Sequence, residues 1–489
     1  MDEYENYQEE DTIAALASAI GGGIAIVRIS GPRALEIGNK VWQGYKKASS
    51  TCEASNTPLV PSASSLLPTD AVRHILSAET KRQMLLGHII DPETGLKGDQ
   101  ALAVYFKGPN SYTGEDVVEL QCHGGAFVAR HTLKACLKAG ARTADPGEYT
   151  KRAYINGRMD LTQAEAVMDL INARSEMAMH IAVRQLDGRL GDSVKELYEA
   201  ITEIHSEIEV RMDFIEEDLD WTTSEQVFAT LDDVNTKITK LLASQRDGAV
   251  LRNGIKAIIG GPPNAGKSSF LNHVLGHNRA IVTDIAGTTR DTLEEQAHIR
   301  GIPIRLIDTA GIREETDDVI ERTGIERSIQ AMKEAQLIFW LIDLSRPLED
   351  QMPPAGIQEA APTVIVLNKT DLNSDTEARE KLAHISPHIC STSILKGDGL
   401  NELYDIVEEI IWEHPHDEEP ELALNERHAQ LLDEAFEQVS ECRQIIEDEE
   451  WELVAINLRG SLDALGQIIG KTALPDILHN IFSKYCIGK

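Results

Sequence analysis

The stretch from Gly261 to Ser268, GPPNAGKS, constrains the fold of this chain more than any other part of its 489 residues. It fits the pattern G-x-x-x-x-G-K-[ST], follows the apolar run KAIIG and precedes the helix-forming run SSFLNHVLG. In such a loop the glycines let backbone N–H groups turn toward phosphates, while Lys267 meets the β- and γ-phosphate oxygens and the Ser268 hydroxyl can ligate magnesium. The sequence therefore predicts a nucleotide-binding α/β domain.

Three further motifs follow in the order that a GTP-hydrolysing domain requires. The run IAGTTRD offers Thr289 as a second magnesium ligand, and IRLIDTAG places Asp308 and Gly311 at a strand end near the γ-phosphate. Where many GTPases keep a water-positioning glutamine, this chain has Ile312, whose apolar side chain cannot orient water. Hydrolysis by this domain must therefore use another group.

The motif VIVLNKTD indicates which base is bound. It supplies Asn368, Lys369 and Asp371. The Asp371 carboxylate can accept hydrogen bonds from the guanine N1–H and 2-amino group, which adenine does not offer, so the sequence predicts GTP rather than ATP. The run STSILKGDG near Ser393 is a weaker candidate for a further loop on the guanine side.

Length and periodicity predict several domains around this one. A chain of 489 residues with 42% hydrophobic content exceeds one usual core. IAIVRIS, residues 24–30, is typical of a strand, and helical spacing begins at a capping-box pattern of Thr162 with Glu165. Helical spacing returns after residue 415, which favours an α/β domain inserted into a helical one. The predicted fold class is multidomain, α/β and α+β, with segments 1–155, 156–250, 251–415 and 416–489.

Composition limits the partners and the compartment. With 47 basic and 80 acidic residues the formal charge is −33, which disfavours extensive direct binding to a polyanion such as RNA; simple solubility explains the acidity equally well. The six cysteines form no CxxC pair and no zinc-type cluster with histidine, which favours a reducing compartment. No long apolar run exists and the N-terminus is acidic, so we expect a cytoplasmic protein without membrane association.

Several stretches together resemble one family over nearly the whole chain. They are Asn264 in the P-loop, IVTDIAGTTRD, DTAGIRE with ERTGIERS, NSYTGEDVVELQCHGG, PGEYTKRAYINGRMDLTQAEAV and the terminal CIGK. The chain is similar to the MnmE (TrmE) family of tRNA modification GTPases. The resemblance implies an N-terminal domain with a tetrahydrofolate-binding fold that forms a homodimer, a central helical bundle and an inserted Ras-like P-loop GTPase domain activated by potassium.

The resemblance also implies a reaction and its partners. A flavoprotein, MnmG (GidA), would join the dimer in a heterotetramer that binds tRNA mainly through the complex. That complex would place an aminomethyl-type group at C5 of the wobble uridine, using 5-formyltetrahydrofolate or a related tetrahydrofolate. The hydrolysis of GTP, with Mg²⁺ and K⁺ bound, would drive a conformational change.

Roles transfer from the family residue by residue. Potassium would be held by Asn264 and the carbonyls of Thr283, Ile285 and Thr288, and magnesium by Ser268 and Thr289. Catalysis would use Glu321, which orients the attacking water through a second water, with Lys267 and Asn264. The full set expected to contact GTP is Asn264, Ala265, Gly266, Lys267, Ser268, Ser269, Thr283, Ile285, Thr288, Thr289, Asp308, Thr309, Ala310, Gly311, Asn368, Lys369 and Asp371.

A folate site is implied by the same resemblance. It would comprise Arg28, Glu119, Arg158 and Lys489, with Cys486 placed nearby for a role in the modification. Arg158 stands where the family frequently has lysine, which keeps the charge but not the shape. Taken without the family, Arg28 also fits a surface cation, Glu119 an edge-strand residue and Glu321 a carboxylate at a helix N-terminus.

Two other functions compete with this one. A ribosome-assembly GTPase shares the GTP-binding motifs, but such factors usually carry a basic RNA-binding domain, whereas the flanks here are acidic helices and a β-containing domain. A small-molecule folate enzyme with a regulatory G domain is disfavoured because no autonomous folate chemistry is evident in the sequence.

Overall fold

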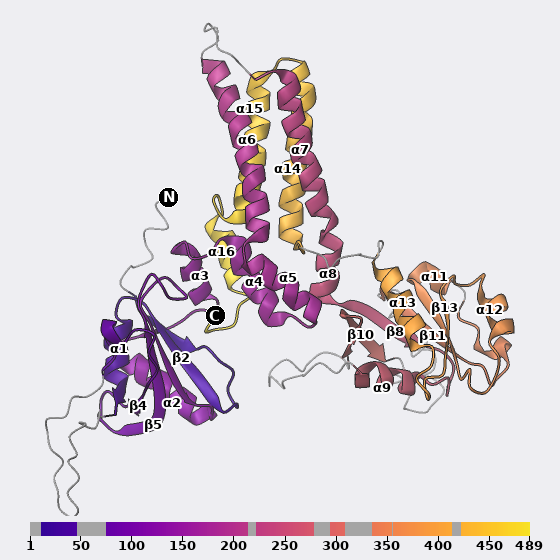
Figure 1. Cartoon of the computed structure of the whole chain (residues 1–489), viewed down its shortest axis with the longest axis horizontal. Coiled ribbons are helices and arrows are strands. Elements are labelled where there is room, and N and C mark those ends of the chain that lie inside the picture. Colours follow the sequence, from indigo (N-terminus) through magenta and orange to yellow (C-terminus); the bar gives the residue numbers. More distant parts are fainter. Residues whose placement is uncertain are drawn as a thin grey trace, which may run out of the picture. The chain divides into compact units, whose positions relative to one another are not determined.

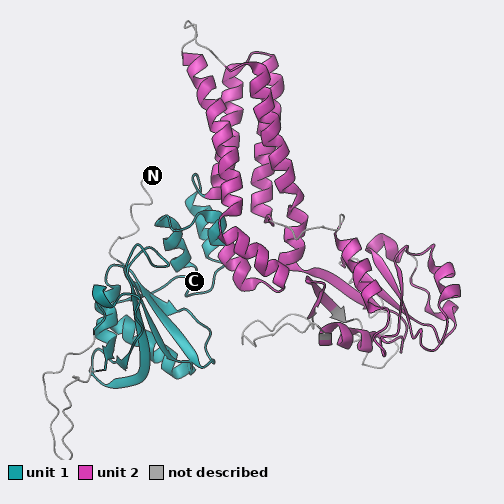
Figure 2. Cartoon of the chain, in the orientation of Figure 1, with its two compact units in different colours: residues 1–165, 470–489 teal, residues 166–469 magenta. Residues whose placement is uncertain are grey.

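The computed structural model of the chain describes residues 11–45, 75–213, 222–277, 294–308, 335–354, 356–412 and 422–489 (Figure 1). The chain divides into two compact units, residues 1–165 with 470–489, and residues 166–469 (Figure 2). The predicted boundaries at residues 155, 250 and 415 stay a prediction, because this division into two units does not test them.

The first unit is built on a seven-stranded sheet with strand order β3-β4-β5-β6-β2-β1-β7. Neighbouring strands pair antiparallel except for β1 and β7, which run parallel. The strands are β1 Ile13–Leu16, β2 Ile24–Ser30, β3 Trp42–Gly44, β4 Leu85–Ile90, β5 Lys97–Phe106, β6 Val117–His123 and β7 Arg142–Thr143. The strand predicted over 24–30 is confirmed.

Side-chain alternation on β2 decides what each face of this sheet does. Ala25, Val27 and Ile29 are buried in the apolar core that also contains buried residues of α1 and α2. Arg28, between two of them in sequence, therefore lies on the opposite face. The helices of this unit are α1 Ala34–Val41, α2 Ala126–Lys138, α3 Glu148–Ile155 and α16 Pro475–Phe482, with a 3₁₀ turn at Ala78–Thr80.

The helix α4, Leu161–Asn172, begins two residues earlier than the predicted capping box allows. Thr162 and Glu165 do not form that box. Asp160 caps the helix instead: its Oδ1 accepts from the Gln163 N–H at 3.0 Å, and Gln163 Oε1 accepts from the Asp160 N–H at 3.0 Å. Asp is as good a cap as Thr, so the pattern two residues upstream prevails and Thr162 falls in the first turn.

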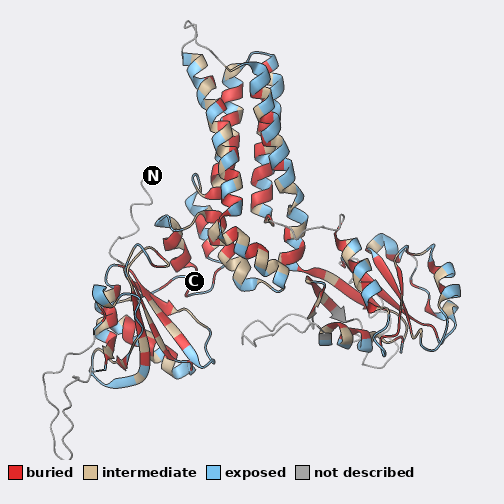
Figure 3. Cartoon of the chain, in the orientation of Figure 1, coloured by how far each residue is buried: buried red, intermediate tan, exposed pale blue. Residues whose placement is uncertain are grey.

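The second unit contains a helical bundle formed by segments on both sides of the P-loop region. Apolar residues at helical spacing, such as Leu197 and Ile201 on one segment and Leu432 and Leu458 on the other, share one buried core (Figure 3). The predicted packing across the insertion is confirmed. The helices are α5 Glu176–Leu186, α6 Arg189–Asp213, α7 Ser224–Ala243, α8 Gln245–Asn253, α14 Glu426–Glu447 and α15 Trp451–Ile469. None of the helices among the described residues is long and apolar enough to cross a membrane.

The inserted part of this unit is a six-stranded sheet with order β13-β12-β11-β8-β10-β9. It is parallel except for the β9–β10 hairpin, and every residue of β11 is buried, as expected for a parallel strand covered on both faces. The predicted α/β and α+β multidomain fold class is thus confirmed. The elements of the inserted domain are β8 Ile255–Gly260, α9 Lys267–His277, β9 Glu294–Ile299, β10 Ile302–Asp308, β11 Leu337–Asp343, η3 Leu348–Gln351, α11 Ile357–Ala360, β12 Thr363–Asn368, α12 Thr376–Leu382, β13 Ile389–Thr392 and α13 Leu400–Ile411.

Candidate functional sites

The P-loop connects β8 to α9 and has a backbone that glycine makes possible. Gly261 and Gly266 have φ angles of 133° and 102°, and an added Cβ would lie 2.4 Å from the Leu341 carbonyl oxygen and 2.4 Å from Asn368 Nδ2, respectively. A side chain at either position would be strained and would clash. The loop therefore has the cradle form that phosphate binding requires.

Lys267 and Asn264 are the two residues of the loop predicted to take part in catalysis. Lys267, the first residue of α9, donates from Nζ to the Gly261 and Pro262 carbonyls at 2.9 and 2.8 Å, which holds the ammonium over the loop. Asn264 adopts a left-handed backbone with φ of 64°, a conformation that asparagine tolerates better than most residues. Ser268 and Ser269 follow in the first turn of α9, whose N-terminus faces the cradle.

Asn368, at the carboxyl end of β12, forms hydrogen bonds to the P-loop and to the loop that follows β13. Its side chain is buried, donates to the Ala265 carbonyl at 2.9 Å and accepts from the Ile394 N–H at 3.2 Å. Ser393 donates to Asp371 Oδ1 at 2.8 Å. The structure therefore brings the P-loop, the NKTD motif and the predicted guanine-side loop into one cluster.

Asp343, at the end of β11, supports this cluster and was not predicted. Lys369, with a left-handed φ of 69°, donates from Nζ to Asp343 Oδ2 at 2.5 Å. Burial by itself raises the pKa of Asp343, but hydrogen bonds from Lys369 and Ser345 outweigh it and hold that pKa below its ordinary value. A buried acid at the carboxyl end of a parallel strand was the signal in the sequence.

The remaining residues predicted for the GTP site are described less completely. Asp308 ends β10 opposite Ile259 of β8, so the end of that strand lies beside the start of the P-loop. The switch residues lie outside the described residues: Thr283, Ile285, Thr288, Thr289, Thr309, Ala310, Gly311, Ile312 and Glu321.

The first unit holds a second cluster around Arg28. Residue 28 on β2 is directly opposite Glu119 on β6, and the two side chains form an ion pair with Nη2 2.9 Å from Oε1. The guanidinium lies over the rings of Tyr112 and Tyr149, with Cζ 5.3 and 5.6 Å from the ring centroids. Tyr149 also donates from its hydroxyl to the Arg28 carbonyl at 2.7 Å.

The C-terminal segment joins this cluster. The Tyr149 N–H donates to the Lys489 carbonyl at 3.2 Å, and Ile487 forms a bridge with Pro146. Gly488 has φ of 100°, and an added Cβ would lie 1.9 Å from the Leu16 carbonyl oxygen, so the chain end runs tightly along β1. Cys486 is exposed three residues before the terminus.

Arg158 is placed beside the loop between β5 and β6 rather than on the sheet face. It is exposed, and its Cγ would lie 3.3 Å from a Cβ added to Gly114, two residues after Tyr112. The structure thus brings Arg28, Glu119 and the Lys489 main chain together, while Arg158 borders the loop that carries Tyr112.

A buried ion network supports this second cluster. Glu148, only 3% exposed, accepts from Arg142 and Arg152, and Arg152 also donates to Glu115. Burial by itself raises the pKa of Glu148, but hydrogen bonds from Arg142, the Asp145 N–H and Arg152 hold it below its ordinary value. The network fixes the start of α3, the helix that carries Tyr149.

Family models and curated relatives match nearly the whole chain. The description "GTP-binding protein TrmE N-terminus" matches residues 12–158, and "MnmE helical domain" matches residues 161–486. A protein named tRNA modification GTPase MnmE from Lactobacillus acidophilus is 38% identical over 98% of this chain and 99% of its own length. The chain belongs to the MnmE family. Relatives with the same name from Clostridioides difficile and Bacillus licheniformis are 38% and 39% identical over 98% of this chain, and over 99% and 100% of their own.

As a member of the MnmE family, the chain is a GTP hydrolase in a family named for tRNA modification. That name favours tRNA modification over ribosome assembly. Among solved structures, the G domain of the T. maritima FeoB iron transporter matches 32% of this chain and 99% of that chain, at 24% identity and a TM-score of 0.24. Motif reasoning missed Tyr112 and Tyr149 in this MnmE-family chain, because both meet Arg28 through contacts distant in sequence. It also missed Asp343 and Glu148, to which none of the motifs assigns a role.

Proposed function

We propose that this MnmE-family GTPase takes part in a folate-dependent modification that places an aminomethyl-type group at C5 of the wobble uridine of tRNA. The observation that carries the proposal is the junction of Tyr149 with the chain end. Its ring flanks the Arg28–Glu119 pair, and its N–H binds Lys489, three residues beyond the exposed Cys486. An exposed thiol near a charged, aromatic-lined cluster suits group transfer.

The residues of this cluster fit a reduced folate. The Glu119 carboxylate, paired with Arg28, can accept hydrogen bonds from a pterin ring, and Tyr112 and Tyr149 offer aromatic surface beside it. The Arg158 cation suits the glutamate tail. A bound tetrahydrofolate would supply the one-carbon unit. The residues of the chain would bind it, orient it and place Cys486 beside it.

The cradle and switch residues would carry out the GTP chemistry. Lys267 would neutralise charge on the β- and γ-phosphates, and Ser268 with Thr289 would hold Mg²⁺. Asn264 with the carbonyls of Thr283, Ile285 and Thr288 would hold K⁺, which takes the place of an arginine supplied to the site, and Glu321 would orient water. The left-handed Asn264 and the glycine cradle support this assignment.

The partners follow from charge and from the family. A formal charge of −33 disfavours strong tRNA binding by this chain alone, so a flavoprotein partner, MnmG, would supply basic surface in a heterotetramer built on a homodimer. We place this complex in the cytoplasm. Tight, salt-sensitive tRNA binding by the isolated chain would contradict this division of labour.

Nucleoside analysis of tRNA tests the function. A strain that lacks this chain should lose the modified wobble uridine, and wild-type protein should restore it. Cys486→Ser and Arg28→Ala should restore little or none, whereas Cys442→Ser, at a buried cysteine of the helical bundle, should restore it. A wobble uridine unchanged by the deletion would exclude the proposed reaction.

Steady-state hydrolysis tests the potassium assignment. Turnover should rise at least tenfold when K⁺ replaces Na⁺ at equal ionic strength, and Glu321→Ala should lose most turnover while GTP affinity is nearly kept. A tenfold change corresponds to about 1.4 kcal/mol, well within what a fixed cation supplies to a phosphoryl-transfer site. Equal rates in the two salts would refute the potassium role without touching GTP binding.

A further inference from the structure

The chain passes between the helical bundle and the G domain, which runs from β8 to α13, at two places that lie side by side. We call these two connecting segments the crossings. The chain passes into the G domain from α8 through Gly254, whose φ is 69°, to β8. It returns at residues 422–425, just before α14. A Cβ added to Gly248 of α8 would lie 2.6 Å from the Leu424 carbonyl oxygen, so the two crossings touch through their backbones.

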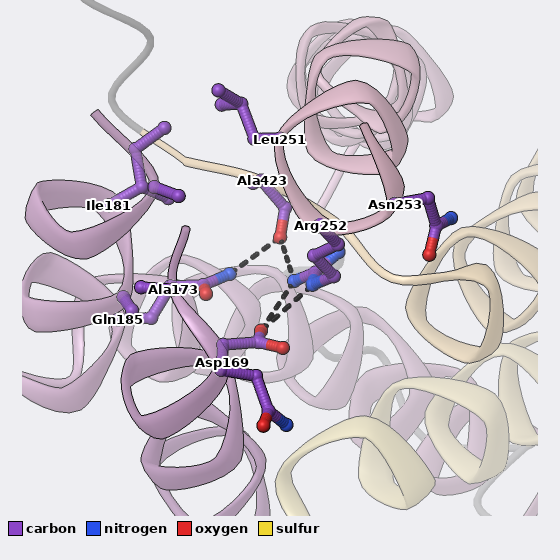
Figure 4. Close-up of a pocket in the computed structure, with 11 residues that line it drawn as sticks. Asp169, Ala173, Ile181, Gln185, Leu251, Arg252, Asn253 and Ala423 are labelled. Atoms are coloured by element: carbon purple, nitrogen blue, oxygen red, sulfur yellow. Dashed lines mark hydrogen bonds and ion pairs between the residues drawn. The ribbon is translucent and has the colours of Figure 1, made fainter. Parts of the chain in front are cut away.

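The side chain of Arg252, on the first crossing, donates hydrogen bonds to the second crossing. Arg252, the penultimate residue of α8, donates from Nη1 to the Leu424 carbonyl at 2.6 Å. From Nη2 it donates to the Ala423 carbonyl at 2.7 Å (Figure 4). Its Nε and Nη2 also bind Asp169 Oδ2 of α4 at 2.9 and 2.8 Å. Gln185 of α5 donates to the same Ala423 carbonyl at 2.6 Å.

The two carbonyls mark the point where the chain passes from one hydrophobic core to the other. Ala423, 3% exposed, belongs to the core that contains β8, β10 and β11, whereas Leu424, 1% exposed, belongs to the core of the bundle. Ile181 of α5 also packs in the G-domain core. Arg252 therefore binds the segment that connects the two cores, which has to move when one core is displaced relative to the other.

The packing around this point leaves room for movement. A pocket of about 250 Å³, partly open to solvent, lies beside Arg252 and is lined by Asp169, Asn172 and Gln185 and by apolar residues of α5 and α8 (Figure 4). Because packed side chains do not fill this space, α4 and α5 can shift against α8. The turn of the β9–β10 hairpin reaches α5, since a Cβ on Gly301 would lie 3.9 Å from Met177 Cβ.

We infer that Arg252 is a positioning residue that couples the nucleotide state of the G domain to the helical bundle through its ion pair with Asp169. The hairpin connects the two switch segments in sequence, so a change at the nucleotide displaces its strands, α5 and the α8 crossing. The Arg252–Asp169 pair carries that displacement into α4. With the pair broken, hydrolysis continues but the bundle no longer follows it. This inference rests on the proposed function, which makes hydrolysis the source of a conformational change.

The first experiment compares hydrolysis with modification in the full complex. Asp169→Ala should keep GTP turnover within twofold of wild type and lower the modified uridine formed per GTP hydrolysed at least tenfold. Asp169→Asn, which keeps an oxygen acceptor, should fall between the two, and thermal melts should show that both variants fold. The matched control is Asp232→Ala, which breaks the exposed Asp232–Arg443 pair between α7 and α14. Unchanged modification per GTP in Asp169→Ala would overturn the inference.

The second experiment does not depend on tRNA chemistry. Labels on cysteines introduced at exposed Glu377 of α12 and Glu434 of α14, with Cys52 and Cys486 replaced by serine, report the distance between G domain and bundle. That distance should change when GDP, aluminium fluoride, Mg²⁺ and K⁺ are added, and the change should fall by at least half in Asp169→Ala. Equal changes in both proteins would overturn the inference. If wild type modifies no tRNA but this response depends on Asp169, the proposed function fails and the coupling stands.

Discussion

The nucleotide site and the Arg28 site are built from different parts of the chain. The nucleotide site depends mainly on backbone: two glycines with positive φ, a left-handed asparagine and loop carbonyls. The Arg28 site depends on side chains that meet across 91 residues of sequence through strand register. The motifs of the nucleotide site are contiguous stretches of sequence, whereas the residues of the Arg28 site come together only when the sheet has formed.

This difference predicts different weaknesses. A backbone site should fail when a Cβ is added, because strain and clash act locally. A side-chain site should fail when its supporting ion network loses a charge, because the remaining buried charges are left unpaired.

The largest effect is expected from Glu148→Gln in the first unit. Removing one partner of a buried ion network costs about 3–5 kcal/mol, and the lower end applies because Arg142 is partly exposed and Arg152 keeps Glu115. Urea unfolding followed by hydrogen exchange in β1 and β2 measures the loss. The control is Glu36→Gln on α1, whose exposed pairs with Arg33 and Lys40 should contribute nothing measurable. Equal stabilities of the two variants would contradict the assigned role of the network.

Gly266→Ala tests the backbone site. We expect GTP affinity to fall about 100-fold, near 2.7 kcal/mol, because strained backbone costs about 1–3 kcal/mol and the new Cβ meets Asn368 Nδ2. Titration with a fluorescent GTP analogue measures it. Gly276→Ala in α9 is the matched control, since an added Cβ there meets nothing within 4 Å. A threefold or smaller loss in Gly266→Ala would show that the cradle tolerates a side chain.

Ligand protection separates the two sites further. At about 30 times its dissociation constant, 5-formyltetrahydrofolate should stabilise the protein by about 2 kcal/mol and raise the exchange protection of β1 and β2. Deletion of Lys489 should weaken this effect, whereas Lys484→Ala on the exposed surface should not. No protection at millimolar folate would argue against a folate site around Arg28.

The sequence predicted the elements whose signals are local. The strand at 24–30, the helical spacing on both sides of the insertion and the P-loop context each depend on a few neighbouring residues, and the structure has all of them. The cap of α4 was misassigned because Asp160 and Thr162 compete two residues apart and only the hydrogen bonds decide between them.

Contacts between distant segments could not be predicted in this way. Arg252 meets Ala423 after 171 residues, and Asn368 meets Ala265 after 103. Neither pairing has a periodicity or a spacing in the sequence, because tertiary packing alone sets it. The folate residues were placed by family resemblance, and their roles stay predictions, as do those of the switch residues.

The smallest effect is a pH dependence confined to the first unit. The folded pKa of Glu148 lies below its ordinary value of 4.5, so its contribution to stability is fully present above that value and is lost as the pH falls through the folded pKa. The stability difference between wild type and Glu148→Gln should therefore be constant near neutral pH and shrink below pH 4.5.

Glu36 is a control for Glu148, because the pKa of Glu36 is also lowered, to about 2, by hydrogen bonds from Arg33 and Lys40. Its side chain is exposed, so solvent and salt screen those bonds and we expect Glu36→Gln to leave the pH dependence unchanged. Hydrogen exchange in β1 and β2 of the three proteins, measured from pH 7 down to 3, gives the comparison after correction for intrinsic exchange rates. A difference for Glu148→Gln that grows as the pH falls would have the wrong sign for a depressed carboxylate and would refute the network as the source of stability.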